Sequence, residues 1–345
     1  MADKPIFEKE NILVTGGAGF IGSHLCDELI KKSKVICIDN FITGQEDNID
    51  HLLKNPDFEF IKHDITIPLK LDELPELDKF KIKFQGIQKI YHLACPTAPR
   101  EYNKIPVETL LANSHGTRNV LELAVQNKAK LLFLSSSSIY GEPLEDAPFK
   151  EDYWGFIDPI GPRSCYNEGK RFAECMVVNY SKKYALEAKI LRVFNTFGPR
   201  MRQDDGRMIP DFIAAALAGR DIEIHSKEDA GSTFCYITDL IEAIQRAMRS
   251  TYSGVINIGN PQELKIVDIG KKIIELTQST SKIVFKESLP YTARQGMPDI
   301  SLAKEKLGWF PVVPLAEGLK ETISQMKGKS RVVGLGNVNL NKVQN

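Results

Sequence analysis

A glycine-rich turn near the start of the chain limits the possible folds more than any other segment. Residues 11–15 read NILVT, a strand pattern, and residues 16–22 read GGAGFIG before a helical pattern begins. Gly16 permits a tight turn, Gly19 lets a ligand approach the backbone, and Gly22 lets the helix pack closely on the strand. Strand, turn and helix in this order predict a cradle for a diphosphate, bound by N–H groups at the helix start.

Short runs rich in Val, Ile and Leu alternate with helical patterns through the first half of the chain. These runs lie at 11–15, 35–39, 58–62, 90–94 and 131–135. Continuously apolar strands are typical of a parallel sheet that helices cover on both faces. The pattern therefore predicts an α/β fold with a Rossmann-type, doubly wound parallel sheet.

Beyond residue 195 the pattern changes to Gly, Pro and polar segments, with helical stretches near 211–218 and 239–250. We expect a Rossmann domain over 1–195 and a smaller C-terminal α/β substrate-binding region over 196–327, with some crossing of the chain between them. Residues 328–345 lack periodicity and predict a loose tail.

Composition excludes several classes of function. The 345 residues include 45 basic and 45 acidic side chains, so no general positive field attracts nucleic acid or a membrane surface. Apolar runs fall far short of the ~20 residues that a membrane span needs. Six cysteines without C-x-x-C spacing predict reduced thiols and no metal site. We expect a cytoplasmic protein with no nucleic-acid or membrane partner.

Acidic residues follow the second and third predicted strands. Asp39 ends the second strand, where a carboxylate accepts hydrogen bonds from ribose hydroxyls and repels a 2′-phosphate. This favours NAD over NADP as the cofactor. Asp64 and Ile65, after the third strand, are placed to contact the adenine.

One tyrosine has a lysine four residues later: Tyr166 and Lys170 share one face of a predicted helix. A free phenol has a pKa near ~10, but a nearby ammonium and a positive nicotinamide ring both favour phenolate. Tyr166 is then the predicted base for a sugar hydroxyl. The serines at 135–138 follow the strand at 131–134, and Ser136 is the best placed to bind the reacting oxygen. These residues predict reversible oxidation of a secondary alcohol.

From about residue 10 to 327 the chain resembles nucleotide-sugar enzymes of the extended short-chain dehydrogenase/reductase superfamily, which includes epimerases and dehydratases, and most closely UDP-glucuronate decarboxylases (UDP-xylose synthases). The segments that carry this resemblance are HLACP at 92–96, EDYWG at 151–155, PIGPRSCYNEGKR at 159–171, RVFNTFGPRM at 192–201 and NIGNP at 257–261.

The resemblance implies bound NAD, a UDP-linked sugar and a homodimer formed by the helices at 107–125 and 167–184. It implies catalytic roles for Tyr166, Lys170, Ser136 and Ser137. The implied cofactor contacts are Gly16, Gly19, Phe20, Ile21, Gly22, Asp39, Asn40, Asp64, Ile65, Leu93, Ala94, Tyr166 and Lys170. The implied substrate contacts are Pro96, Ser138, Asn195, Arg207, Tyr236 and Arg294.

The chain departs from the decarboxylase pattern at three places. Ser138 stands where the family has a catalytic glutamate, and Ser232 and Gly296 stand where it has arginines. Since a diphosphate needs cationic partners in a neutral protein, Arg207 and Arg294 become the candidates.

These departures leave two reactions open. Decarboxylation of UDP-glucuronate to UDP-xylose is favoured by most of the sequence, whereas the serine line at 136–138 is similar to that of UDP-hexuronate and UDP-hexose 4-epimerases. A dehydratase would need an acid and a base where Ser137 and Ser138 stand. A non-catalytic NAD-binding protein would have no use for Tyr166 and Lys170.

Overall fold

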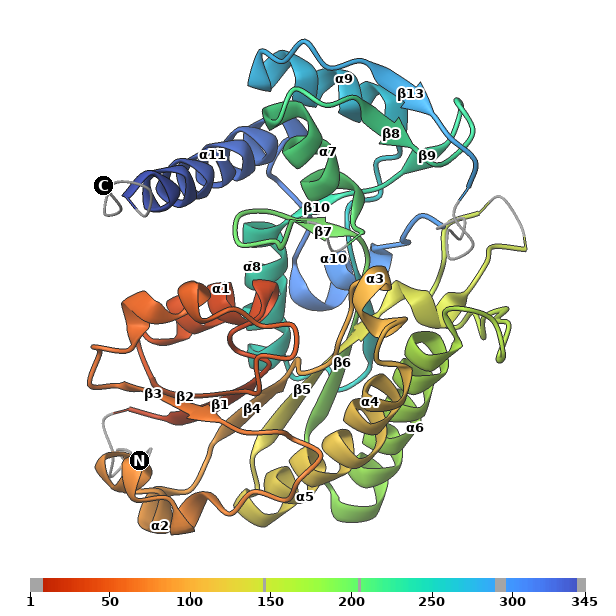
Figure 1. Ribbon diagram of the computed structural model, residues 1–345. Coiled ribbons are helices and arrows are strands. Elements are labelled where there is room, and N and C mark those ends of the chain that lie inside the picture. The colour runs from red at the N-terminus through yellow and green to blue at the C-terminus, as the bar shows by residue number, and fades with distance from the viewer. Residues whose placement is uncertain (1–8, 145–146, 204–205, 289–295, 340–345) are drawn as a thin grey trace.

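The computed structural model describes residues 9–144, 147–203, 206–288 and 296–339, with side chains through residue 328 (Figure 1). The strands of the main sheet are β1 (Asn11–Thr15), β2 (Lys34–Asp39), β3 (Phe58–Lys62), β4 (Lys89–His92), β5 (Lys130–Ser136), β6 (Ala188–Val193) and β11 (Val255–Ile258). They form a seven-stranded sheet in the order β11-β6-β5-β4-β1-β2-β3, and all pairs are parallel. The predicted doubly wound α/β fold is confirmed.

Both faces of this sheet are buried. In β1, Ile12 and Val14 point into one hydrophobic cluster and Leu13 into another, because successive strand residues face opposite sides. The helices that cover the two faces are α1 (Phe20–Leu29) and α8 (Ile237–Arg249) on one side, and α5 (Thr117–Asn127) and α6 (Ser164–Tyr184) on the other. This double burial explains why the strands are apolar throughout.

The helix expected at 107–125 contains a widened turn. It comprises α4 (Pro106–Leu111), a π-helical segment (Ala112–Gly116) and α5. From this segment, Asn113 Nδ2 donates to Thr109 O at 2.9 Å and to Cys95 Sγ at 3.0 Å. The widened turn thus connects the helix to the segment that follows β4.

The second half of the chain builds a smaller α/β region and also returns to the sheet. Its remaining elements are β7 (Thr196–Phe197), α7 (Met208–Leu217), β8 (Ile222–Ile224), β9 (Gly231–Ser232), β10 (Cys235–Tyr236), β12 (Leu264–Lys265), α9 (Ile266–Thr277), β13 (Ile283–Phe285) and α10 (Ser301–Leu307). Since β11 pairs with β6 and α8 packs on the sheet, the chain crosses between the two regions. Two short helices flank β4 in the sequence: α2 (Ile82–Gln85) precedes it, and α3 (Pro99–Tyr102) follows it.

The sequence predicts a loose tail from residue 328, and the structure is helical as far as residue 339. Helix α11 (Leu315–Asn339) runs through this stretch. Leu319, Ile323 and Met326 anchor its first turns because they are buried at helical spacing. No proline interrupts the sequence that follows, and an anchored helix extends by one hydrogen bond per added residue. None of the helices in the described ranges has the length and apolar character to cross a membrane.

The register of the sheet brings the strand ends to one edge. Thr15, the last residue of β1, pairs with Ile38 of β2 on one side and with His92 of β4 on the other. The segments that follow these strands therefore leave the sheet together, and ligand sites of doubly wound sheets lie at this edge.

Candidate active site

A cavity of about 1520 Å³ opens at this edge, between the strand ends and the C-terminal region. Its lining comes from the glycine turn, the ends of β2, β4 and β5, α6, and the segments around α7. Pockets for one drug-sized molecule rarely exceed about 1,000 Å³, so this cavity has room for a dinucleotide and a second ligand.

The glycine turn lies at the floor of the cavity with almost no free volume around it. Gly16 has φ of 72°, and its N–H donates to the Ile38 carbonyl at 2.7 Å. A Cβ at Gly16 would lie 2.8 Å from Ala94 Cα, and one at Gly22 would lie 2.1 Å from the Gly16 carbonyl oxygen. Helix α1 begins directly after Gly19, so its first N–H groups face the cavity. This cradle fits a diphosphate.

The Asp39 carboxylate lies beside the glycine turn and can accept hydrogen bonds from ribose hydroxyls. Its carboxylate accepts hydrogen bonds from the N–H groups of Ala18 at 3.0 Å and Phe41 at 2.9 Å. Burial raises the pKa of Asp39, and these two hydrogen bonds oppose the rise. Because each carboxylate oxygen can accept more than one hydrogen bond, capacity remains for a ribose.

Asn40 and Asp64 extend this end of the cavity. Asn40 Nδ2 donates to Asp64 Oδ2 at 3.1 Å, and Asp64 Oδ1 accepts from Thr66 N and Oγ1, both at 2.8 Å. Burial works to raise the pKa of Asp64, but the hydrogen bonds from Thr66 and Asn40 outweigh it and lower the pKa. The other predicted cofactor contacts on the lining are Phe20, Ile21, Ile65, Leu93 and Ala94.

Tyr166 lies at the other end, on the first turn of α6, and is 6% exposed. Its phenol is hydrogen-bonded to Ser136, the last residue of β5. Ser136 Oγ also accepts from the backbone N–H of Ser138 at 3.1 Å. The preceding serine is occupied elsewhere, because Ser135 Oγ donates to Glu174. The folded chain therefore brings Ser136, and not Ser135, to the tyrosine.

The chain alone keeps the phenol protonated. Burial raises the pKa of Tyr166 well above its ordinary value, and the neighbouring Cys95 and Tyr102 raise it further. Its hydrogen bond with Ser136 and the charge of Arg207 lower the pKa by less than this.

Lys170, on the same helix face as Tyr166, makes its hydrogen bond with the backbone of β5. Its Nζ donates to the Leu134 carbonyl at 2.9 Å and lies 4.8 Å from the centre of the Phe133 ring. Burial lowers the pKa of Lys170, and Cys95 and Glu174 oppose this. Positive charge brought into the cavity by a ligand would favour the phenolate form of Tyr166.

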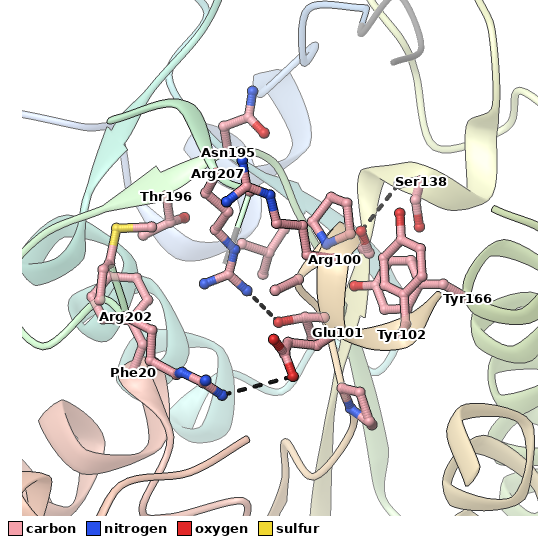
Figure 2. Close-up of a pocket in the computed structure, with 18 of the residues that line it drawn as sticks. Phe20, Arg100, Glu101, Tyr102, Ser138, Tyr166, Asn195, Thr196, Arg202 and Arg207 are labelled. Carbon is pink, nitrogen blue, oxygen red and sulfur yellow. Dashed lines mark hydrogen bonds and ion pairs between the residues drawn. The ribbon is translucent and has the colours of Figure 1, made fainter. Parts of the chain in front are cut away.

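Ser137 and Ser138 line the cavity next to Tyr166. The Ser138 hydroxyl is buried and has no hydrogen-bond partner among the residues that the structure describes. Figure 2 shows Ser138 and Tyr166 on one side of the cavity, facing Phe20 and Arg202 across it. A buried hydroxyl without a partner is costly, so this atom is available to a ligand.

Most of the predicted substrate contacts meet in the same cavity. Asn195 Nδ2 donates to the Ser232 hydroxyl at 3.0 Å, and Arg207 donates to Thr97. Pro96 also belongs to the lining. Ser232, where the resemblance implies an arginine, thus makes a small polar contact with Asn195.

Two predicted substrate residues are not brought to the cavity by the described structure. Tyr236 packs on Phe197 with ring centres 5.4 Å apart and is not part of the lining. Arg294 lies outside the described residues. At Gly296 a Cβ would lie 2.5 Å from the Phe149 ring, so an arginine there would displace that ring.

Arg163 and Tyr102 are among the lining residues that the sequence patterns did not indicate. Arg163 precedes Tyr166 by one helical turn, and this spacing was a usable signal. The sequence gives no such signal for Tyr102, because only the folded helix α3 brings Tyr102 to Tyr166. In the described ranges, no group of three His, Cys, Asp or Glu residues could hold a metal ion.

Comparison with known families agrees with this geometry. The sequence pattern of the NAD dependent epimerase/dehydratase family matches residues 12–259. UDP-glucuronic acid decarboxylase 6 of Arabidopsis thaliana is 45% identical over 310 residues, which cover 89% of this chain and 86% of that protein. UDP-glucuronic acid decarboxylase 1 of Xenopus tropicalis is 42% identical over 317 residues, or 92% of this chain and 72% of that protein. The chain belongs to the NAD dependent epimerase/dehydratase family, which confirms the resemblance.

Solved structures of epimerases share the fold. UDP-glucose 4-epimerase of Thermotoga maritima superimposes with a TM-score of 0.82 at 27% identity, covering 93% of this chain and 99% of that one. UDP-glucuronic acid 4-epimerase of Bacillus cereus, solved with UDP-glucuronic acid and NAD, superimposes with a TM-score of 0.80 at 30% identity, covering 92% and 99%.

The close packing of Gly22 on the Gly16 carbonyl can be tested by substitution. Gly22→Ala places a Cβ against the Gly16 carbonyl, so the turn must shift and NAD affinity should fall about 100-fold. Isothermal titration calorimetry with NAD measures the affinity. Gly328→Ala is the matched control, because a Cβ there meets no atom within 4 Å. Unchanged affinity in a folded Gly22→Ala variant would contradict the assignment of the cradle.

Proposed function

We propose that this member of the family binds NAD, oxidises the C4 hydroxyl of UDP-glucuronate and releases carbon dioxide to form UDP-xylose. The observation that carries the proposal is the Tyr166 phenol, hydrogen-bonded to Ser136 in a cavity that continues to the glycine turn. The choice of sugar rests on the decarboxylases that are 40 to 45% identical to this chain.

The residues of the chain control one proton in the first step. When bound, NAD accepts the hydride of the sugar C4 and returns it at the end of the cycle. Tyr166 takes the proton of the C4 hydroxyl, while Ser136 donates a hydrogen bond to the reacting oxygen. Positive charge bound beside the buried phenol lowers its pKa.

Loss of carbon dioxide follows from the C4 ketone. The carboxylate is β to this ketone, so the electron pair of the breaking bond passes into the enolate oxygen. Tyr166 and Ser136 stabilise that oxygen by hydrogen bonding. C5 then takes up one proton, and reduction of C4 with the proton held by Tyr166 completes a redox-neutral cycle.

A 4-epimerase is the second candidate. The observation that favours it is the serine line, in which the unpaired Ser138 hydroxyl stands where the decarboxylases have a glutamate. Epimerisation requires only that the keto-sugar turn over before hydride returns to its other face. The Bacillus cereus 4-epimerase, 30% identical to this chain, supports this alternative.

We further propose the functional division 1–195 for the cofactor and 196–327 for the nucleotide sugar, with β11 and α8 crossing back to the first part. The proposed location is the cytoplasm. All six cysteines are free thiols, which is typical of reducing compartments.

The proposed assembly is a homodimer through the helices at 107–125 and 167–184, to which α4, α5 and α6 belong. Of these, α4 and α6 lie next to each other in Figure 1. Large apolar side chains are exposed on both helices: Val107, Leu110 and Leu111 on α4, and Phe172, Val178 and Tyr184 on α6. Exposed apolar side chains on neighbouring helices favour a protein contact.

Product analysis tests the reaction. Incubation with UDP-glucuronate should give UDP-xylose and carbon dioxide, detected by mass spectrometry, and a product of unchanged mass with a new retention time would favour the 4-epimerase. Tyr166→Phe should lower kcat by about 10²- to 10⁴-fold because it removes the proton acceptor. If Tyr166→Phe kept its turnover, the assigned base would be wrong. Absence of any turnover by the unaltered protein would instead favour a non-catalytic NAD-binding protein.

Sedimentation velocity tests the assembly. Phe172→Glu places a charge in the proposed helical interface and should convert dimers into monomers. Phe84→Glu is the matched control, because Phe84 is an exposed phenylalanine on α2, away from α4 and α6. Equal sedimentation of both variants and the unaltered protein would contradict an interface at Phe172.

A further inference from the structure

Tyr102 stacks face to face on Tyr166. The ring centres lie 5.1 Å apart, and the planes differ by 2°. Tyr102 is 1% exposed, and both rings belong to a small buried cluster completed by Cys165. Figure 2 shows the two rings overlapping beside Ser138. The phenol of Tyr166 is thus held at two points, by Ser136 at its oxygen and by Tyr102 at its face.

The backbone around Tyr102 fixes the second ring. Tyr102 N–H donates to the Ala98 carbonyl at 3.0 Å, and the Cys165 thiol donates to the Tyr102 carbonyl at 3.7 Å. Cys165 directly precedes Tyr166 on α6. Short helix α3 and the start of α6 are therefore tied together by main chain as well as by the ring stack.

The other side chains of α3 reach the C-terminal region. Arg100 pairs with Asp211 of α7 at 3.4 Å, and Glu101 pairs with Arg202 at 3.9 Å. Three consecutive residues of one helical turn thus contact the catalytic tyrosine and the region that holds the sugar nucleotide. Helix α3 therefore connects the Tyr166 ring with that region.

We propose that Tyr102 is a positioning residue that acts through its ring: the stack holds the Tyr166 phenol oxygen on Ser136, and the ion pairs of α3 connect this alignment to the sugar-binding region. The inference rests on the proposed function, in which Tyr166 is the base. The positioning role requires the aromatic face of Tyr102 and not its hydroxyl. Misplacement of a reacting group by about 1 Å costs on the order of 100-fold in rate, so the stack affects kcat.

Substitutions that keep or remove the ring test the proposal in the NAD-loaded protein with UDP-glucuronate. Tyr102→Phe keeps the stack, and its kcat and KM should stay within about 2-fold of the unaltered protein. Tyr102→Leu removes the stack and should lower kcat by about 10- to 100-fold with little change in KM. Tyr102→Met carries the same expectation if the leucine variant does not fold.

The pH profile separates positioning from a merely structural role. A base must be deprotonated, so activity is lost as pH falls through its pKa. Since the hydrogen bond with Ser136 lowers the pKa of Tyr166, its loss in Tyr102→Leu should move the acid limb of the kcat profile to higher pH. A fluorine NMR label at Tyr166 should also shift when the stacked ring is removed, in the absence of any ligand.

A second tyrosine pair provides the control. Tyr180 and Tyr184 lie 5.2 Å apart at the far end of α6, so Tyr184→Leu should leave kcat and the pH profile unchanged. Normal kcat and an unmoved acid limb in Tyr102→Leu would overturn the proposal, as would a raised KM in Tyr102→Phe, which would assign the hydroxyl to substrate. Absence of turnover by the unaltered protein would contradict the proposed function instead, while the fluorine shift would still report on the stack.

Discussion

The contact between the glycine turn and helix α1 is the constraint on which the site depends. Gly22 lies so close to the Gly16 carbonyl that any side chain would separate the helix from the strand end. Gly16 in turn leaves no room beside Ala94, so the segment after β4 is held against the same turn. The close packing around Gly16 therefore fixes the positions of the α1 N-terminus, the floor of the cavity and the start of the segment that leads to α3.

The second constraint is electrostatic. The catalytic candidate Tyr166 lies in a buried environment that disfavours its charged form, and Lys170 is bonded to a backbone carbonyl. In the proposed function, Ser136 and Tyr102 position the phenol, and the positive charge of the bound cofactor favours its deprotonated form.

Local sequence patterns predicted the sheet, the glycine turn, Asp39 and the pair of Tyr166 and Lys170, because each depends on short-range spacing. The helix through residue 339 was missed because its anchor, the buried face around Ile323, exists only after folding. Tyr102 was missed for the same reason. Tyr236 was assigned to the substrate by resemblance, but tertiary packing directs its ring onto Phe197. Helical spacing places Tyr166 and Lys170 on one face, but only the folded structure shows that Lys170 Nζ donates to the Leu134 carbonyl.

In the proposed function, a phenol and a dinucleotide act on one carbon of a bound sugar. Deuterium at C4 of UDP-glucuronate provides the test, because the label must leave with the hydride and return to the same carbon without exchange with water. We expect the product to retain the deuterium at C4, and Tyr166→Phe to transfer it far more slowly. Deuterium lost to solvent, or a product formed without any isotope effect in either protein, would contradict oxidation at C4.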